Sequence, residues 1–183
     1  MKIVIVGCGR VGAMLAETYD AAGHQVVILD IVTEAFGRLA GTFRGSAVRG
    51  DGTDEDTLRR AGAEDADIFL TLTEGDNRNV MAAQMAAEAL AARKVIAKIN
   101  DPVRAAAYAE LGLTTICRTT LISDAINAHL GLPASGRPGI FPSVGTHAGH
   151  DHTLGTVGNR SRRLGSDGAG AAESAVHVES RGA

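Results

Sequence analysis

Short apolar runs alternate with longer stretches of mixed apolar and polar residues from residue 3 to residue 130. The short runs are rich in valine and isoleucine, and lie at residues 3–6, 26–29, 47–48, 68–70, 95–97 and 115–117. Because apolar residues occupy consecutive positions in these runs, the runs are typical of strands that are covered on both faces. The stretches between them predict helices at residues 11–22, 34–43, 55–61, 77–92, 102–111 and 120–130.

This alternation predicts an α/β fold. Repeated strand–helix–strand units with short connections require right-handed crossovers and hence a parallel sheet. We expect a Rossmann-type, doubly wound parallel sheet of six strands in the order 3-2-1-4-5-6. Local signals support two of the helices, because Asp54 and Asp101 stand where capping residues stand, and Pro102 follows Asp101 at the first helical position.

The periodic pattern ends near Pro133. Residues 134–183 contain ten of the 23 glycines and four of the six histidines. Such a segment cannot bury enough apolar surface to offset the entropy of ordering the chain. We therefore expect one ordered domain over residues 1–132 and a low-complexity, disordered tail over residues 133–183.

Composition and charge exclude several classes of function. The 18 lysines and arginines stand against 21 acidic residues, and aromatic residues make up 3% of the chain. Nucleic acid is therefore not expected as a partner, since neither positive charge nor stacking side chains are in excess. The chain has no uninterrupted apolar run long enough for a membrane span, and the run at residues 3–6 is too short for a signal peptide. The two cysteines, Cys8 and Cys117, fit a reducing cytoplasm and buried strand ends.

The first loop carries a phosphate-binding motif, since residues 7–12 match G-x-G-x-x-G between a predicted strand and a predicted helix. Gly7 suits the tight turn, Gly9 lets backbone amides approach a pyrophosphate, and Gly12 allows close packing of helix on sheet. The free amides at the start of the helix attract the anion. The alternative is that the glycines serve the turn alone.

Asp30 ends the second predicted strand, 18 positions after Gly12. Its carboxylate can accept hydrogen bonds from both ribose hydroxyls of an adenosine, and its charge would repel a 2′-phosphate. Ile31 and Val32 supply no arginine to bind such a phosphate. NAD(H) or ADP/ATP is therefore favoured over NADP(H). The alternative is that Asp30 caps the next helix.

Two further loops follow the third and fourth predicted strands at the edge of the sheet where ligands bind. In the loop at residues 50–54, the backbone and Asp51 are placed to contact the edge of the base. The loop at residues 73–79 brings Thr73 and Asn79 to the same edge. The alternatives are a generic Gly/Asp turn for the first loop and helix capping by Asp76 for the second.

These segments together, with residues 98–102, resemble the N-terminal domain of the Trk/Ktr potassium-uptake regulators, also called the RCK N-terminal or TrkA-N domain. The resemblance covers residues 1–127. It implies a cytoplasmic, non-enzymatic, nucleotide-binding regulatory subunit, peripheral at the inner face of the plasma membrane. Such a subunit forms a homo-oligomer, a dimer or a ring of dimers, and gates a membrane potassium transporter or channel in response to NAD(H) or ADP/ATP.

The resemblance also implies roles for individual residues. The glycines and Arg10 would contact phosphate, Asp30 the ribose and Asp51 the adenine. The helix at residues 120–130, which has a broad apolar stripe, would cross to a neighbouring subunit; the alternative is that it folds back on its own domain. No catalytic and no metal-binding residue is expected. The expected nucleotide-binding residues are Gly7, Gly9, Arg10, Val11, Gly12, Asp30, Asp51, Thr73 and Asn79.

The chain departs from the family pattern in two places. Only the glycine-rich segment follows residue 132, where the regulators usually carry a second RCK domain. After the sixth predicted strand, where the family often has a Pro-Glu pair, this chain has Arg118, Thr119 and Thr120, so the role of that glutamate in holding a cation is not transferred. Two other functions are kept as alternatives, an NAD-dependent oxidoreductase and a redox-sensing NAD-binding module. The histidines at residues 147–152 would be a metal site only if ordered structure fixed their geometry.

Overall fold

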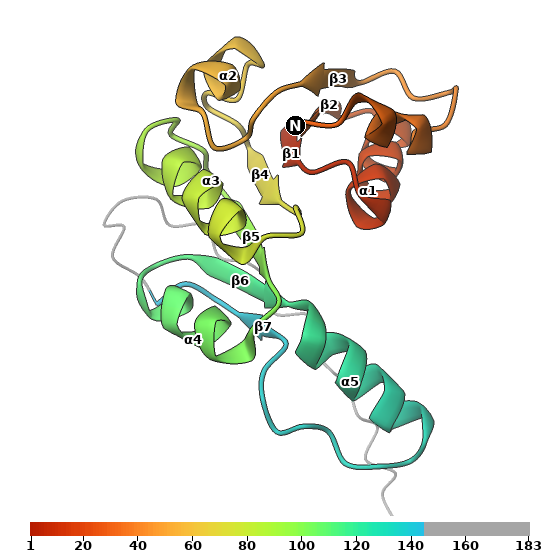
Figure 1. Cartoon of the computed structure of the whole chain (residues 1–183), viewed down its shortest axis with the longest axis vertical. Helices are drawn as coiled ribbons and strands as arrows, with labels where there is room; N and C mark the ends of the chain where they lie inside the picture. Colours follow the sequence, from red (N-terminus) through yellow and green to blue (C-terminus); the bar gives the residue numbers. More distant parts are fainter. Residues whose placement is uncertain (145–183) are drawn as a thin grey trace, which may run out of the picture. The chain divides into compact units, whose positions relative to one another are not determined.

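The computed structural model describes residues 1–144, which form strands and helices in close alternation (Figure 1). The order along the chain is β1 (Lys2–Val6), α1 (Arg10–Ala21), β2 (Gln25–Asp30), η1 (Thr33–Arg38), β3 (Ser46–Arg49), α2 (Glu55–Arg60), β4 (Ile68–Thr71), α3 (Asp76–Glu88), β5 (Val95–Ile99), α4 (Pro102–Glu110), β6 (Thr114–Cys117), α5 (Arg118–His129) and β7 (Ile140–Phe141). The predicted α/β fold is confirmed.

All these strands belong to one sheet in the order β3-β2-β1-β4-β5-β6-β7. The first six are parallel and stand in the predicted order. The sheet has seven strands, however, and not the predicted six. The additional strand β7 runs antiparallel to β6 and pairs Thr115 with Phe141 and Ile116 with Ile140. It lies in the segment 133–183, which the sequence predicts to be a disordered tail; residues 145–183 of that segment are outside the described residues.

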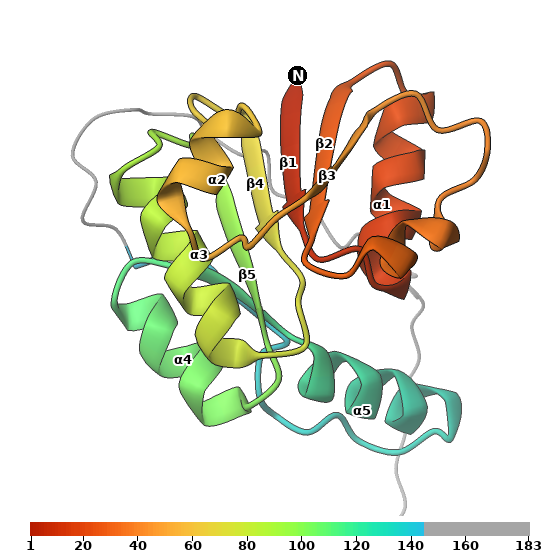
Figure 2. The same cartoon turned by 45° about the horizontal axis from the view of Figure 1, so that its top comes forward.

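Helices cover the sheet on both sides (Figure 2). Alternate residues of β1 point to opposite sides, so Ile3 and Ile5 pack in one core with α1, while Val4 and Val6 pack in another with Phe69 and α3. A third core joins β5, β6 and α4. The last four side chains of β1, at residues 3–6, are almost completely buried, which explains why they form a continuous apolar run.

Most predicted helices are present, with ends that differ by a few residues. The predicted helix at residues 34–43 is an exception, because this segment forms only the short 3-10 helix η1. Gly37 and Gly41 explain the difference, since glycine in a helix interior loses backbone entropy and weakens the helix. The two predicted caps are confirmed: Asp54 accepts from Thr57 N at 3.0 Å and Asp101 accepts from Val103 N at 2.8 Å.

Helix α5 follows β6 without a connecting loop and buries very little of its surface. Within the described structure, Thr120 is the one buried residue of α5. Leu121, Ile122 and Ile126 are 41%, 53% and 54% exposed. The chain then returns beside the start of the helix, where a side chain at Gly139 would overlap Leu121.

Candidate functional site

The loop between β1 and α1 is shaped by its glycines. Gly7 has a positive φ of 107°, and a Cβ at this position would lie 2.9 Å from the backbone of Leu72 and Thr73. A Cβ at Gly12 would overlap the carbonyl oxygen of Gly7, so α1 can sit directly on the loop only because neither residue has a side chain. Gly9 is the N-cap of α1, without a side-chain cap, and a Cβ at this position would meet no other atom within 4 Å, so the space beside it is open. The first amides of α1 therefore remain available to an anion.

Asp30, at the end of β2, fastens this loop to the sheet. Its Oδ2 accepts from Cys8 N at 2.8 Å and its Oδ1 accepts from Val32 N at 2.9 Å. Gly7 N also donates to Leu29 O at 2.7 Å. Each carboxylate oxygen keeps a second acceptor site, so Asp30 can hold the loop and still accept hydrogen bonds from a ligand.

Cys8 is buried between the loop and η1. Its Sγ lies 3.4 Å from Ala35 O, and Arg38 Nη1 donates to Ala35 O at 3.3 Å and to Cys8 O at 3.5 Å. Burial, together with the negative charge of Asp30, raises the pKa of the Cys8 thiol. The thiol is therefore protonated at neutral pH and is a poor nucleophile.

The loop after β3 forms the opposite wall. Asp51 Oδ1 accepts from Thr53 N at 2.9 Å and from Thr53 Oγ1 at 2.7 Å. These hydrogen bonds, first from the amide and then from the hydroxyl, hold the pKa of Asp51 below its usual value. A side chain at Gly52 would overlap Val6, so the absence of one lets the loop pack directly on β1.

Asn79 organises the loop after β4. It is fully buried, and its Oδ1 accepts from Thr73 N at 2.9 Å and from Thr73 Oγ1 at 2.8 Å. Its Nδ2 donates to Thr73 O at 3.0 Å and to Lys98 O at 2.8 Å. Asn79 thus fixes Thr73 and ties β4 to β5.

Asp76, the alternative capping residue in the same loop, does not cap α3, whose N-cap is Gly75. The carboxylate of Asp76 instead accepts from Asn100 N at 2.9 Å.

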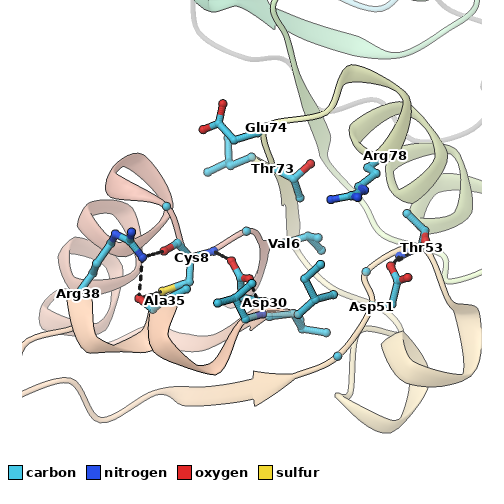
Figure 3. Close-up of a pocket in the computed structure, with 18 residues that line it drawn as sticks. Val6, Cys8, Asp30, Ala35, Arg38, Asp51, Thr53, Thr73, Glu74 and Arg78 are labelled. Atoms are coloured by element: carbon cyan, nitrogen blue, oxygen red, sulfur yellow. Dashed lines mark hydrogen bonds between the residues drawn. The ribbon is translucent and has the colours of Figure 1, made fainter.

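These loops enclose a cavity of about 380 Å³ at the carboxyl end of the central strands (Figure 3). Of the expected binding residues, five line it: Gly7, Gly9, Asp30, Asp51 and Thr73. The other four do not. Arg10 and Val11 are exposed in the first turn of α1, Gly12 packs behind the loop, and Asn79 lies behind Thr73.

Sequence reasoning missed four polar residues that also line the cavity: Arg38, Thr53, Glu74 and Arg78. Arg38 qualifies the argument that no arginine accompanies Asp30, because η1 brings it to the cavity from eight positions further along the chain. The 3-10 helix was not foreseen, and without it the spacing gave no reason to consider Arg38. Arg78 was visible in the 73–79 segment, but its direction depends on how α3 begins.

A charged cluster lies beside the cavity, where β5 and β6 end. Lys98 is 7% exposed, and its Nζ lies 4.0 Å from Glu74 Oε1. Arg118 Nη1, in the first turn of α5, is 3.8 Å from Glu74 Oε2. Burial lowers the pKa of Lys98, Glu74 opposes this effect, and Arg118 adds to it.

A protein-family model described as the TrkA-N domain matches residues 3–119. This chain belongs to the TrkA-N domain family. It is also 40% identical over 166 residues to the Trk system potassium uptake protein TrkA of Streptomyces coelicolor, an alignment that covers 90% of this chain and 74% of the relative. Against five further curated relatives, the matched part spans between 22% and 52% of their length.

Solved structures agree with the TrkA-N fold. The TrkA-N domain of the inner membrane protein YbaL from Escherichia coli superposes with a TM-score of 0.63 at 20% identity, over 70% of this chain and 96% of that one. A structure described as the GsuK channel bound to NAD gives a TM-score of 0.57 at 18% identity, over 68% of this chain and 22% of that one. Identities this low establish the fold alone.

No helix among residues 1–144 is both long and apolar enough to cross a membrane. Within the same residues, no three or more His, Cys, Asp or Glu side chains come together as potential metal ligands. The histidines at residues 147–152, considered above as a possible metal site, lie outside the described part of the chain.

Proposed function

We propose that this TrkA-N domain binds NAD(H) or ADP/ATP in the cavity between the Gly7 loop and the Asp51 loop. The observation that carries the proposal is the position of Asp30, which holds Cys8 N at 2.8 Å and lines the cavity beside the uncapped start of α1. A nucleotide phosphate fits the amides of that helix start, and the ribose hydroxyls fit the free acceptor sites of Asp30. The negative charge of Asp30 favours NAD(H) over NADP(H), because it would repel the 2′-phosphate of NADP(H).

Binding is proposed to regulate and not to catalyse. The cavity lining contains no histidine, lysine or tyrosine, and its one thiol, Cys8, has a raised pKa. Of the carboxylates in the lining, Asp30 and Asp51 already accept hydrogen bonds from backbone amides of the loops, which suits binding better than proton transfer. The family and the Streptomyces relative support a regulatory subunit of a potassium uptake system that acts on a membrane potassium transporter or channel. Its place would be cytoplasmic, at the inner face of the plasma membrane.

A homo-oligomer, a dimer or a ring of dimers, is part of this proposal. The apolar side chains of α5 remain exposed although residues 133–141 return past the start of the helix. A second copy would cover them. Nucleotide binding at one subunit could then change the position of its neighbour and reach the membrane partner.

Calorimetric titration with NAD, NADH, ADP and ATP tests the nucleotide site. We expect at least one of these nucleotides to bind. Asp30→Asn should lower the affinity for that nucleotide roughly 10- to 150-fold, because hydrogen bonds to a charged group contribute about 1.5–3 kcal/mol. Asp65→Asn is the matched control, because Asp65 is exposed and absent from the cavity lining. Equal affinities for the wild type and Asp30→Asn would remove Asp30 from the site.

The regulatory role is tested in a bacterial strain that lacks its own TrkA-type regulator and grows poorly in low potassium. The wild-type chain should restore growth, and Asp30→Asn should restore it less. Growth restored equally by both would separate potassium uptake from nucleotide binding at this cavity.

A further inference from the structure

Arg78 enters the cavity from the first turn of α3. Its side chain folds back over the start of the helix, since a Cβ on Gly75 would lie 3.8 Å from Arg78 Cγ and 3.9 Å from Arg78 Cδ. Figure 3 shows its guanidinium directed into the cavity, on the side that carries Asp51 and Thr53. The Arg78 side chain thus packs beside Gly75, the N-cap residue of α3.

The guanidinium of Arg78 has no hydrogen bond and no ion pair among residues 1–144. Its charge is nevertheless close enough to Asp51 to contribute to the low pKa of that carboxyl. The other arginine of the lining, Arg38, donates to two carbonyl oxygens and is fixed by them. The cavity thus contains one fixed guanidinium and one that is free to bind.

The walls near Arg78 suit an adenine base. No aromatic side chain lines the cavity, which leaves the guanidinium groups of Arg38 and Arg78 as the lining side chains that can stack on a base. Apolar side chains, including Val6, Leu29 and Leu72, supply a surface for one face of a ring. Asp51 uses only its Oδ1 toward Thr53, and its Oδ2 is free to accept from an exocyclic amine.

We infer that Arg78 stacks its guanidinium on the adenine of the bound nucleotide and so closes the base end of the cavity. This inference rests on the proposed nucleotide site. The planar, weakly hydrated guanidinium is attracted by the face of an aromatic ring. A phosphate role fits less well, because the phosphate already has the amides of the Gly7–Gly9 loop, and Arg78 shares its side of the cavity with Asp51.

The test uses the full chain with Arg78→Ala, Arg78→Lys and the control Arg93→Ala. Arg93 is also exposed but pairs with Asp67, away from the cavity lining. Each protein is titrated with adenosine, AMP, ADP and NAD. We expect Arg78→Ala to weaken all four by one common factor of about 3- to 30-fold. Arg78→Lys should recover only part of the loss, because an ammonium group has no plane to stack, and Arg93→Ala should bind like the wild type.

Two outcomes would overturn the stacking role while leaving the nucleotide site in place. One is unchanged affinity of Arg78→Ala for every ligand. The other is a loss that is absent with adenosine and grows from AMP to ADP, with full rescue by Arg78→Lys, which identifies a phosphate contact. If the wild type binds none of the four ligands, the proposed nucleotide site fails and the inference fails with it.

A spectroscopic readout separates stacking from a structural role. On adenosine binding, the Nε–H resonance of Arg78 should shift through the ring current of the base, and the corresponding resonance of Arg38 should shift less. An Arg78 resonance that does not move on saturation with adenosine would contradict the inference. Melting temperatures of the unliganded variants should match the wild type, because Arg78 makes no hydrogen bond within the described residues.

Discussion

Helices α3 and α5 have almost the same length, 13 and 12 residues, but differ in what they bury. Five residues of α3 are buried, and three of them are alanines: Asn79, Val80, Ala82, Ala83 and Ala86. Helix α5 has larger aliphatic residues, yet Thr120 is its one buried residue in the described structure. Small side chains let α3 lie close against the sheet, whereas the larger side chains of α5 have no such surface beneath them. An apolar stripe therefore identifies a face to be covered and does not say which molecule covers it.

The largest expected effects come from placing a charge on each of these helices. Ala83→Asp would bury an unpaired carboxylate in α3, so we expect a loss of roughly 4 kcal/mol or more in the free energy of unfolding, enough to unfold the domain.

Ile126→Asp places the same charge on the exposed face of α5. It should leave a folded protein that binds nucleotide, but weaken self-association by about 100-fold or more. Circular dichroism and light scattering report the two results.

Ala125→Ser is a control, since it changes the neighbouring position of α5 without adding a charge. If Ile126→Asp unfolds like Ala83→Asp, α5 packs within its own chain and the contrast between the helices disappears. A wild-type protein that stays monomeric at high micromolar concentration with nucleotide present would contradict the proposed oligomer.

Removing residues 133–144, which follow α5, should have a smaller effect on the free energy of unfolding. Their removal should destabilise the domain, because Cys117 N donates to Gly139 O at 2.8 Å and Phe141 packs against the core between β6 and α4. We expect a chain that ends at Leu132 to lose about 1–3 kcal/mol in free energy of unfolding relative to a chain that ends at Val144. Urea unfolding of the two chains measures the difference.

Hydrogen exchange in the same pair sharpens the comparison of the helices. Asp124 Oδ1 accepts from Ser135 N at 2.7 Å, so the shorter chain also loses a contact of α5. Amides of α5 should then exchange faster, while those of α3 should not change. Identical urea midpoints would show that β7 adds no stability to the sheet.

Much of the fold could be predicted because local signals and the global pattern agree. Consecutive apolar residues mark each of the six parallel strands, and Asp54 and Asp101 cap the helices that were predicted to follow them. Strand β7 escaped because two residues, Ile140 and Phe141, are too few to show a period. Its pairing depends on the exposed edge of β6, which a local pattern does not describe.

The candidate site was predictable where backbone geometry determines it and not where side-chain direction does. Gly7 and Gly12 are required by close contacts that any Cβ would break, so their spacing identifies them. Asn79 stands in the right loop, but its four hydrogen bonds turn it inward to hold Thr73 and Lys98. The direction of Arg78 depends on where α3 begins, and spacing along the chain does not reveal it.

Lys98 connects the two helices electrostatically and should give the smallest effect. It shares Glu74, which precedes α3, with Arg118, the first residue of α5. Burial holds the pKa of Lys98 below its ordinary value of about 10.4. The folded state therefore binds this proton more weakly than the unfolded state, which disfavours folding at neutral pH.

Lys98→Met removes this cost and fills similar space, so its free energy of unfolding at pH 7 should equal or slightly exceed that of the wild type. As the pH rises through the folded-state pKa of Lys98 toward its unfolded value, the wild type loses the proton from the folded state first and gains stability. The advantage of Lys98→Met should therefore shrink with rising pH, while other alkaline titrations cancel between the two proteins. Urea unfolding at several pH values up to about 10 measures this trend. Two results would contradict this prediction: a stability difference between the two proteins that grows with pH, or a Lys98→Met protein that is clearly less stable than the wild type at pH 7. Either result would mean that the ion pair of Lys98 with Glu74 stabilises the fold by more than the burial of Lys98 costs. The Glu74 cluster would then contribute to holding the start of α3 near the start of α5.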